Sequence, residues 1–149
     1  MNNVKAPAGS LVGVERRMFM KKVFLGGTCN ESTWRDYLIS DLIIDYFNPV
    51  VEDWTPECME EEIRQRQECD YCLYTITPKM TGVYSIAEVI DDSNKRPRQT
   101  LFCLLDEDDG ELFTEGQRRS LLQVLEMVKR NGGKTFISLY SVSQYLNNH

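Results

Sequence analysis

Two short apolar runs constrain the fold of this chain most. They are Tyr71-Cys72-Leu73-Tyr74-Thr75-Ile76 and Thr100-Leu101-Phe102-Cys103-Leu104-Leu105. Continuous apolar strands of this length are typical of a parallel sheet that helices cover on both faces. The two runs therefore predict buried strands inside an α/β domain.

Strands and helices are expected to alternate from Lys22 onward. Further strands are predicted at residues 23–25, within 45–51 and at 134–139. Helices are predicted after Ser32, Thr55 and Thr114 as N-terminal caps, with Ser85 opening another and Ser141 with Gln144 capping the last. The apolar residues expected to face the sheet are Trp34, Tyr37, Leu38, Leu42 and Ile43 in the first helix, and Leu121, Leu122, Leu125 and Val128 in the fourth.

Five strands alternating with five helices predict one domain over residues 21–149, preceded by an N-terminal extension over residues 1–20. The expected architecture is a three-layer α/β sandwich with a five-stranded parallel sheet in a flavodoxin-like or Rossmann-like order. The first strand is then central. Ligands of such sheets bind at the carboxyl ends of the strands, so the loop after the first strand should border a crevice.

Composition excludes several function classes. The 149 residues carry a net charge of −6, which argues against a nucleic-acid polymer as partner. No apolar stretch approaches the length of a membrane span. The five cysteines are odd in number and no secretory signal precedes them, which favours a cytoplasmic protein. Cys69 and Cys72 form a CxxC that straddles a helix end and a strand start, so we expect core packing there rather than a metal or redox site.

Glu88 is the main candidate for chemistry. It follows the buried run 71–76, near the first turn of a helix at the ligand-binding edge of the sheet. The only histidine is His149, the last residue, so a carboxylate is expected to act if the protein is an enzyme. Ser85 and Glu88 also have the spacing of a capping box. In that alternative, Glu88 would only satisfy a backbone N–H of its own helix.

Two loops at the same edge could contact a ligand. Gly26-Gly27-Thr28-Cys29-Asn30 lies between a strand and a helix, where glycines allow close backbone approach and the helix N-terminus attracts an anion. In such turns, glycines can also be present only for the backbone conformation, without contacting a ligand. Asp53-Trp54 could read and stack on a flat ring, or could be a surface loop with a packing tryptophan. The acidic run Asp106–Glu111 lacks calcium-loop spacing and predicts a solvated loop.

Several stretches together resemble the nucleoside 2-deoxyribosyltransferase superfamily, above all its branch of short deoxyribosyltransferase-like proteins. The similarity covers about residues 22–105. The stretches that carry it are Val23-Phe24-Leu25-Gly26-Gly27-Thr28, Phe47-Asn48-Pro49, Asp53-Trp54, Cys69-Asp70-Tyr71-Cys72-Leu73-Tyr74-Thr75-Ile76-Thr77-Pro78 and Gly82-Val83-Tyr84-Ser85-Ile86-Ala87-Glu88.

The resemblance implies N-glycosidic bond cleavage or transfer on a 2′-deoxynucleoside or its 5′-monophosphate, without metal or organic cofactor. Glu88 would be the nucleophile that forms a covalent glycosyl ester, and Glu62 would match the second acid. It implies a small-molecule nucleoside or nucleotide as partner and a homo-oligomeric assembly. The residues that it places at the substrate are Gly26, Gly27, Thr28, Asn30, Asp53, Trp54, Thr81, Gly82, Tyr84 and Ser85.

Gly82 departs from the family pattern. Six positions before the nucleophile, the family's transferases carry aspartate and its monophosphate glycosidases carry serine. Thr81 and Ser85 flank the glycine and could substitute. The departure keeps two alternatives to an enzyme open: a non-catalytic nucleotide-binding module on the same fold, and a subunit whose main role is assembly.

Overall fold

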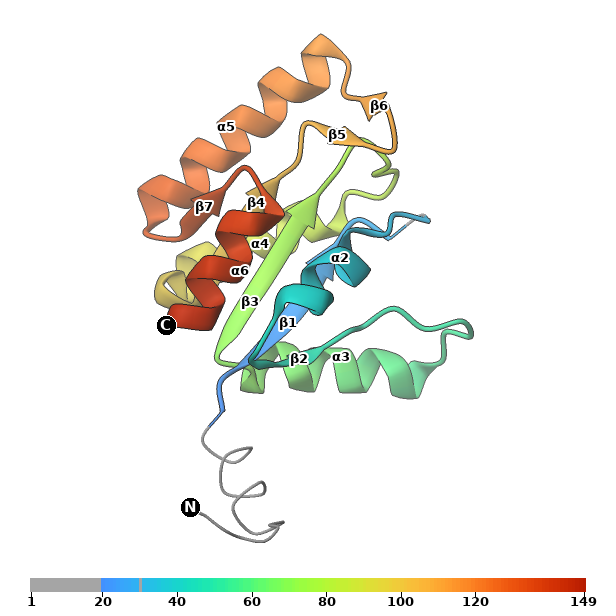
Figure 1. Cartoon of the computed structure of the whole chain (residues 1–149), viewed down its shortest axis with the longest axis vertical. Helices are drawn as coiled ribbons and strands as arrows, with labels where there is room; N and C mark the ends of the chain where they lie inside the picture. The colour runs from blue at the N-terminus through green and yellow to red at the C-terminus, as the bar shows by residue number, and fades with distance from the viewer. Residues whose placement is uncertain (1–19, 30) are drawn as a thin grey trace, which may run out of the picture.

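The computed structural model describes residues 20–29 and 31–149 of the chain. Its centre is a five-stranded sheet in the order β2-β1-β3-β4-β7 (Figure 1), and every pairing in this sheet is parallel. The strands are β1 Lys22–Gly27, β2 Asp45–Phe47, β3 Tyr71–Ile76, β4 Thr100–Leu104 and β7 Lys134–Phe136. This confirms the predicted fold class, with the flavodoxin-like order and the first strand inside the sheet.

Helices cover both faces of the sheet, as the apolar runs predict. One buried cluster joins α2 and α6 to one face, and a second joins α4 and α5 to the other. Helix α3 lies beside α4, where ion pairs connect the two. The helices are α2 Trp34–Asp41, α3 Pro56–Glu68, α4 Tyr84–Lys95, α5 Glu115–Asn131 and α6 Leu139–Asn148, and the 3-10 turn η1 Pro97–Gln99 precedes β4.

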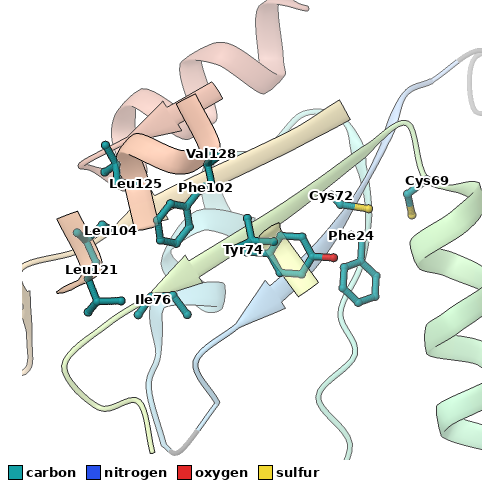
Figure 2. Packing of buried hydrophobic residues seen from close by; sticks show 11 residues of the cluster. Phe24, Cys69, Cys72, Tyr74, Ile76, Phe102, Leu104, Leu121, Leu125 and Val128 are labelled. Atoms are coloured by element: carbon teal, nitrogen blue, oxygen red, sulfur yellow. The ribbon is translucent and has the colours of Figure 1, made fainter. Parts of the chain in front are cut away.

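The core on the α4 and α5 side carries the CxxC. Figure 2 shows Cys69 at the end of α3 and Cys72 on β3 within a cluster that includes Phe24, Tyr74 and Phe102. Both cysteines are buried free thiols. Burial raises the pKa of Cys69 to about 11 and that of Cys72 to about 12. Protonated, buried thiols behave as small apolar side chains, so these two cysteines pack in the core as expected.

Helix ends follow the predicted caps at two of five places. Thr55 and Thr114 cap α3 and α5, and Thr114 forms a capping box with Gln117. The last helix starts three residues earlier than predicted, because the Ser138 hydroxyl rather than that of Ser141 accepts the capping bond. The N-caps of α2 and α4 make no side-chain capping bond.

Three apolar residues that were expected to face the sheet are exposed instead: Tyr37, Ile43 and Leu122. Helix α2 ends at Asp41, so Ile43 lies beyond it and is exposed, and Tyr37 points away from the sheet and is also exposed. Leu122 of α5 is also exposed. The acidic run is mostly exposed, as predicted, but it forms a short hairpin of β5 Glu107–Asp108 and β6 Glu111–Leu112 rather than an irregular loop.

The predicted N-terminal extension over residues 1–20 lies outside the described residues, apart from Met20. Within residues 20–29 and 31–149, no helix is long and apolar enough to cross a membrane.

Candidate functional site

Two adjoining cavities lie at the carboxyl ends of β1 and β3. Their volumes are about 290 and 270 Å³, and both are lined by Gly27, Cys29, Tyr84 and Ser85. This is the edge at which parallel sheets bind ligands. The larger cavity is also lined by Phe24, Gly26, Arg35, Pro49, Val50, Val51, Trp54, Glu62 and Glu88.

The loop after β1 forms the floor shared by both cavities. Gly27 has a φ of +118°, and a Cβ at this position would collide with the backbone of Thr75. The next residue, Thr28, donates its backbone N–H to the Thr75 carbonyl at 2.9 Å. The Thr28 hydroxyl accepts the N–H of Thr77 at 3.0 Å. Glycine is therefore required here for the loop to close onto β3.

Arg35 holds the same loop from the α2 side, and sequence reasoning missed it. Its guanidinium donates to the carbonyl oxygens of Leu25 at 3.0 Å, Thr28 at 2.7 Å and Gly27 at 3.3 Å. Burial lowers the pKa of Arg35, but the arginine stays charged at neutral pH. The loop is thereby fixed, and a positive charge lies at the wall of the larger cavity. Nothing in the sequence marks this arginine as buried.

Glu88 borders the larger cavity from α4. Its side chain is 11% exposed, and it accepts no hydrogen bond from the described part of the chain. The helix begins at Tyr84 with Val83 as N-cap, so Ser85 lies inside the helix and caps nothing. The capping-box alternative for Glu88 is therefore not formed. Within residues 20–29 and 31–149, this carboxyl forms no hydrogen bond to its own backbone or to another side chain.

The surroundings of Glu88 raise the pKa of its carboxyl above that of a free glutamate. Burial raises its pKa to about 7; the Arg66 charge opposes the rise, and the charges of Glu62 and Asp92 add to it. Among the described residues, Glu88 has one ion pair, which joins its Oε2 to Arg66 Nη1 at 3.6 Å. The site thus holds a carboxyl that gains or loses its proton near neutral pH, a property common in catalytic groups.

Glu62 lines the same cavity from α3. Burial raises its pKa, and the charges of Arg35 and Arg66 partly oppose this rise. Glu62 and Glu88 thus reach one cavity from different helices. Two carboxyls with raised pKa values at one cavity can divide the roles of nucleophile and proton donor.

The other predicted residues differ in whether they line a cavity. Trp54 and Tyr84 are exposed by 62% and 73% and line the cavities, and Thr81 and Gly82 line the smaller one. A Cβ at Gly82 would meet nothing within 4 Å, so the glycine leaves open space. Asp53 is exposed and is not among the residues that line either cavity. Asn30 lies outside the described residues.

The β5–β6 hairpin is fastened to the loops that follow β1 and β3. The Ser32 hydroxyl donates to Asp108 at 2.6 Å, and Lys79 pairs with Asp109 at 2.8 Å. The acidic run therefore stabilises the site loops. No group of three potential metal ligands occurs within residues 20–29 and 31–149.

Comparison with known proteins identifies the family. The family model described as "nucleoside 2-deoxyribosyltransferase like" matches residues 20–106. This range covers more than half of the chain and contains β1 to β4, both cavities, Glu62 and Glu88. Searches among curated proteins and solved structures found no match. The chain belongs to the nucleoside 2-deoxyribosyltransferase-like family.

Proposed function

We propose that this protein cleaves or transfers the N-glycosidic bond of a 2′-deoxynucleoside or its 5′-monophosphate. Family membership supports a function on nucleosides in general, and the two carboxyls of the larger cavity support this particular chemistry. The observation that carries the proposal is Glu88: a half-buried carboxyl without hydrogen-bond partners in the described chain, at the wall of a cavity of about 290 Å³.

The first step forms a covalent glycosyl-enzyme. A carboxylate oxygen of Glu88 bonds to C1′ of the sugar while the bond from C1′ to the base nitrogen breaks. The bonding electron pair leaves with the base, and Glu62 supplies a proton to it. The transition state resembles an oxocarbenium ion, which the negative charge of Glu88 stabilises.

The second step releases the sugar. The oxygen of water, or the nitrogen of a second base, bonds to C1′ while the ester bond to Glu88 breaks. Glu62, now ionised, takes the proton of the incoming nucleophile. Glu88 leaves as a carboxylate, so the protein returns to its starting state. Water makes the protein a hydrolase, and a second base makes it a transferase.

The substrate is proposed to lie across both cavities. Gly26, Gly27 and Thr28 would contact the sugar and its 5′ side, and Trp54 would stack on the base. Thr81, Gly82, Tyr84 and Ser85 line the adjoining space, where the absence of a side chain at Gly82 leaves room for a 5′-phosphate.

The test is base release. The protein is incubated with each deoxynucleoside and each deoxynucleoside monophosphate, with and without a second free base, and free or exchanged base is measured. We expect release by the wild type and none by Glu88→Ala at equal folded concentration. Release that persists in Glu88→Ala would remove Glu88 from the nucleophile role.

A non-catalytic nucleotide-binding role is the second candidate, and Gly82 favours it. The family's polar side chain at this position is missing, and none of the described residues fills its space. In this case calorimetry would detect nucleotide binding of equal strength by the wild type and by Glu88→Ala, with no base released by either.

We also propose that the protein assembles with copies of itself. Large apolar side chains are exposed at the cavities, on α3 and just before α4, and an extended apolar surface is typical of an interface. They are Val50, Val51, Trp54, Met59, Ile63, Val83 and Tyr84. Sedimentation velocity would give a dimer or larger species if the proposal is right, and a monomer at all concentrations would contradict it.

A further inference from the structure

We propose that Arg66 is the positioning residue of Glu88: its guanidinium, fixed by the buried carboxylate of Asp92, holds the Glu88 carboxylate ionised and oriented toward the cavity. The inference deepens the proposed function and rests on it for its role in the reaction. The contact between Arg66 and Glu88 itself can be tested without any reaction.

Arg66 reaches from α3 to three carboxylates on α4, those of Glu88, Asp91 and Asp92. Its Nε and Nη2 donate to Asp92 at 3.2 and 3.0 Å, and its Nε also donates to the Tyr74 hydroxyl at 2.9 Å. Its third nitrogen, Nη1, lies 3.6 Å from Glu88 Oε2. One side of the guanidinium is therefore anchored, and the remaining nitrogen faces Glu88.

The anchor is rigid and carries surplus positive charge. Asp92 is 3% exposed, and it also accepts the Tyr74 hydroxyl at 2.5 Å and Arg96 Nη2 at 3.0 Å. Two arginines thus share one buried carboxylate, which leaves about one positive charge uncompensated within this group. The exposed Asp91, which pairs with Arg66 at 3.4 Å, is itself paired with Lys95 at 3.0 Å. Glu88 is the remaining carboxylate in contact with Arg66.

The distance suits a nucleophile. At 3.6 Å the contact is electrostatic and longer than a hydrogen bond, so both oxygens of Glu88 remain available to C1′. The charges that shift the pKa of Glu88 are those of Glu62 and Arg66 on α3 and of Asp92 on α4, and of these three Arg66 alone favours the ionised form. Arg35 of α2 lines the same cavity, but its guanidinium is bonded to carbonyl oxygens of β1 and the loop that follows it.

The test compares Arg66→Gln and Arg66→Lys with Arg64→Gln. Arg64 is an exposed arginine two residues away on α3, and its ion pairs in the described part of the chain are with Glu61 and Glu68. Arg66→Gln is expected to fold, because Asp92 keeps Tyr74 and Arg96 as partners. The protein is labelled at the glutamate side-chain carboxyl carbon, and the Glu88 signal is assigned by its loss in Glu88→Gln. Carbon NMR then gives the titration midpoint of Glu88.

We expect Arg66→Gln to raise the Glu88 midpoint by about 1 to 3 pH units, the usual effect of losing a close opposite charge. Arg66→Lys should lie in between, since lysine keeps the charge but lacks the fork that spans two carboxylates. Arg64→Gln should match the wild type. An unchanged midpoint in folded Arg66→Gln overturns the inference. If Arg66→Gln does not fold, a Glu88 midpoint in Arg66→Lys equal to that of the wild type overturns the inference instead.

The pH profile of base release gives the second measurement. Its acidic limb should move to higher pH in Arg66→Gln, so that release at pH 6 falls about tenfold or more, with partial rescue in Arg66→Lys. A purely structural role would lower the amount of folded protein without moving this limb. Absence of release from the wild type would end the proposed function but leave the Glu88 titration intact, so the two claims fail separately.

Discussion

Two carboxyl groups on successive turns of α4 have opposite surroundings. Asp92 is closed off from solvent and is bonded to Tyr74, Arg66 and Arg96. Glu88, one turn earlier on the same side of the helix, has an ion pair with Arg66 and lines a cavity. The Asp92 carboxylate thus has several hydrogen-bond and ion-pair partners, whereas the Glu88 carboxylate has few.

The difference separates stability from function. A buried carboxylate with complete partners fixes the packing of α3 against α4. A half-buried carboxyl with incomplete partners lowers the stability of the folded protein when it is ionised, and it is retained for what it can do to a ligand.

Asp92→Asn should give the largest loss of stability. The substitution removes the negative charge that two arginines share, and breaking a buried ion pair from one side costs about 3 to 5 kcal/mol. Chemical denaturation would measure the loss. Asp91→Asn, the exposed neighbour, serves as control and should unfold like the wild type. Equal stability of both variants would contradict the structural role of Asp92.

Glu88→Gln should stabilise the folded protein at alkaline pH, whereas Asp92→Asn destabilises it. Burial raises the pKa of Glu88 from 4.5 to about 7, so the folded state binds this proton more tightly than the unfolded state. The stability that Glu88 contributes below pH 4.5 is lost as the pH rises through about 7. Relative to the wild type, Glu88→Gln should therefore gain up to about 3 kcal/mol between pH 4 and pH 8.

The same denaturation series measures this gain at both pH values. Glu60→Gln, an exposed glutamate on α3, controls for the loss of one negative charge from an acidic chain. A Glu88→Gln variant that tracks the wild type at every pH would show that Glu88 is as well satisfied as Asp92.

Trp54→Ala should weaken substrate binding without affecting stability. The indole is 62% exposed and borders the cavity of Glu88, and stacking on a base is worth about 1 to 3 kcal/mol. We expect KM for base release to rise about tenfold. Tyr37→Ala, an equally exposed aromatic on α2, should leave KM unchanged. A similar rise in both variants would argue against a base at Trp54.

Ser85→Ala should have the smallest effect. Because α4 has no side-chain cap, the change in unfolding free energy should stay within about 0.5 kcal/mol. Thr114→Ala breaks the capping box of α5 and should cost about 0.5 to 2 kcal/mol. If thermal unfolding shows the same loss in both variants, Glu88 belongs to a capping box after all, and the contrast with Asp92 is lost.

Sequence patterns were sufficient to predict the sheet. Tyr71–Ile76 forms a strand with the predicted bounds, because six consecutive buried residues leave few other solutions. The loops were harder. Ser138 rather than Ser141 caps α6, since two serines with similar spacing compete and only tertiary packing selects one. The β5–β6 hairpin depends on Ser32 and Lys79 from distant loops, which no local pattern reveals.

Some residues that line the cavities could be singled out from the sequence, and others could not. Glu88 and Glu62 are recognisable from motifs, and the glycine turn at Gly27 from its position after a strand. Arg66 lies in a charged helical stretch that resembles a solvated surface. Its four-residue spacing from Glu62 places both on one side of α3, and this was the available signal. That Asp92 and Tyr74 would anchor it follows only from the packing of α3 against α4.

The most direct test of the account is to trap the covalent intermediate. The protein is mixed with a deoxynucleoside or monophosphate that supports base release, quenched in acid, digested and examined by mass spectrometry. We predict one deoxyribosyl or deoxyribosyl phosphate group on the peptide that contains Glu88, and none on this peptide in Glu88→Gln. Base release without any such adduct, or an adduct on another residue, would contradict the assignment of Glu88 as the nucleophile.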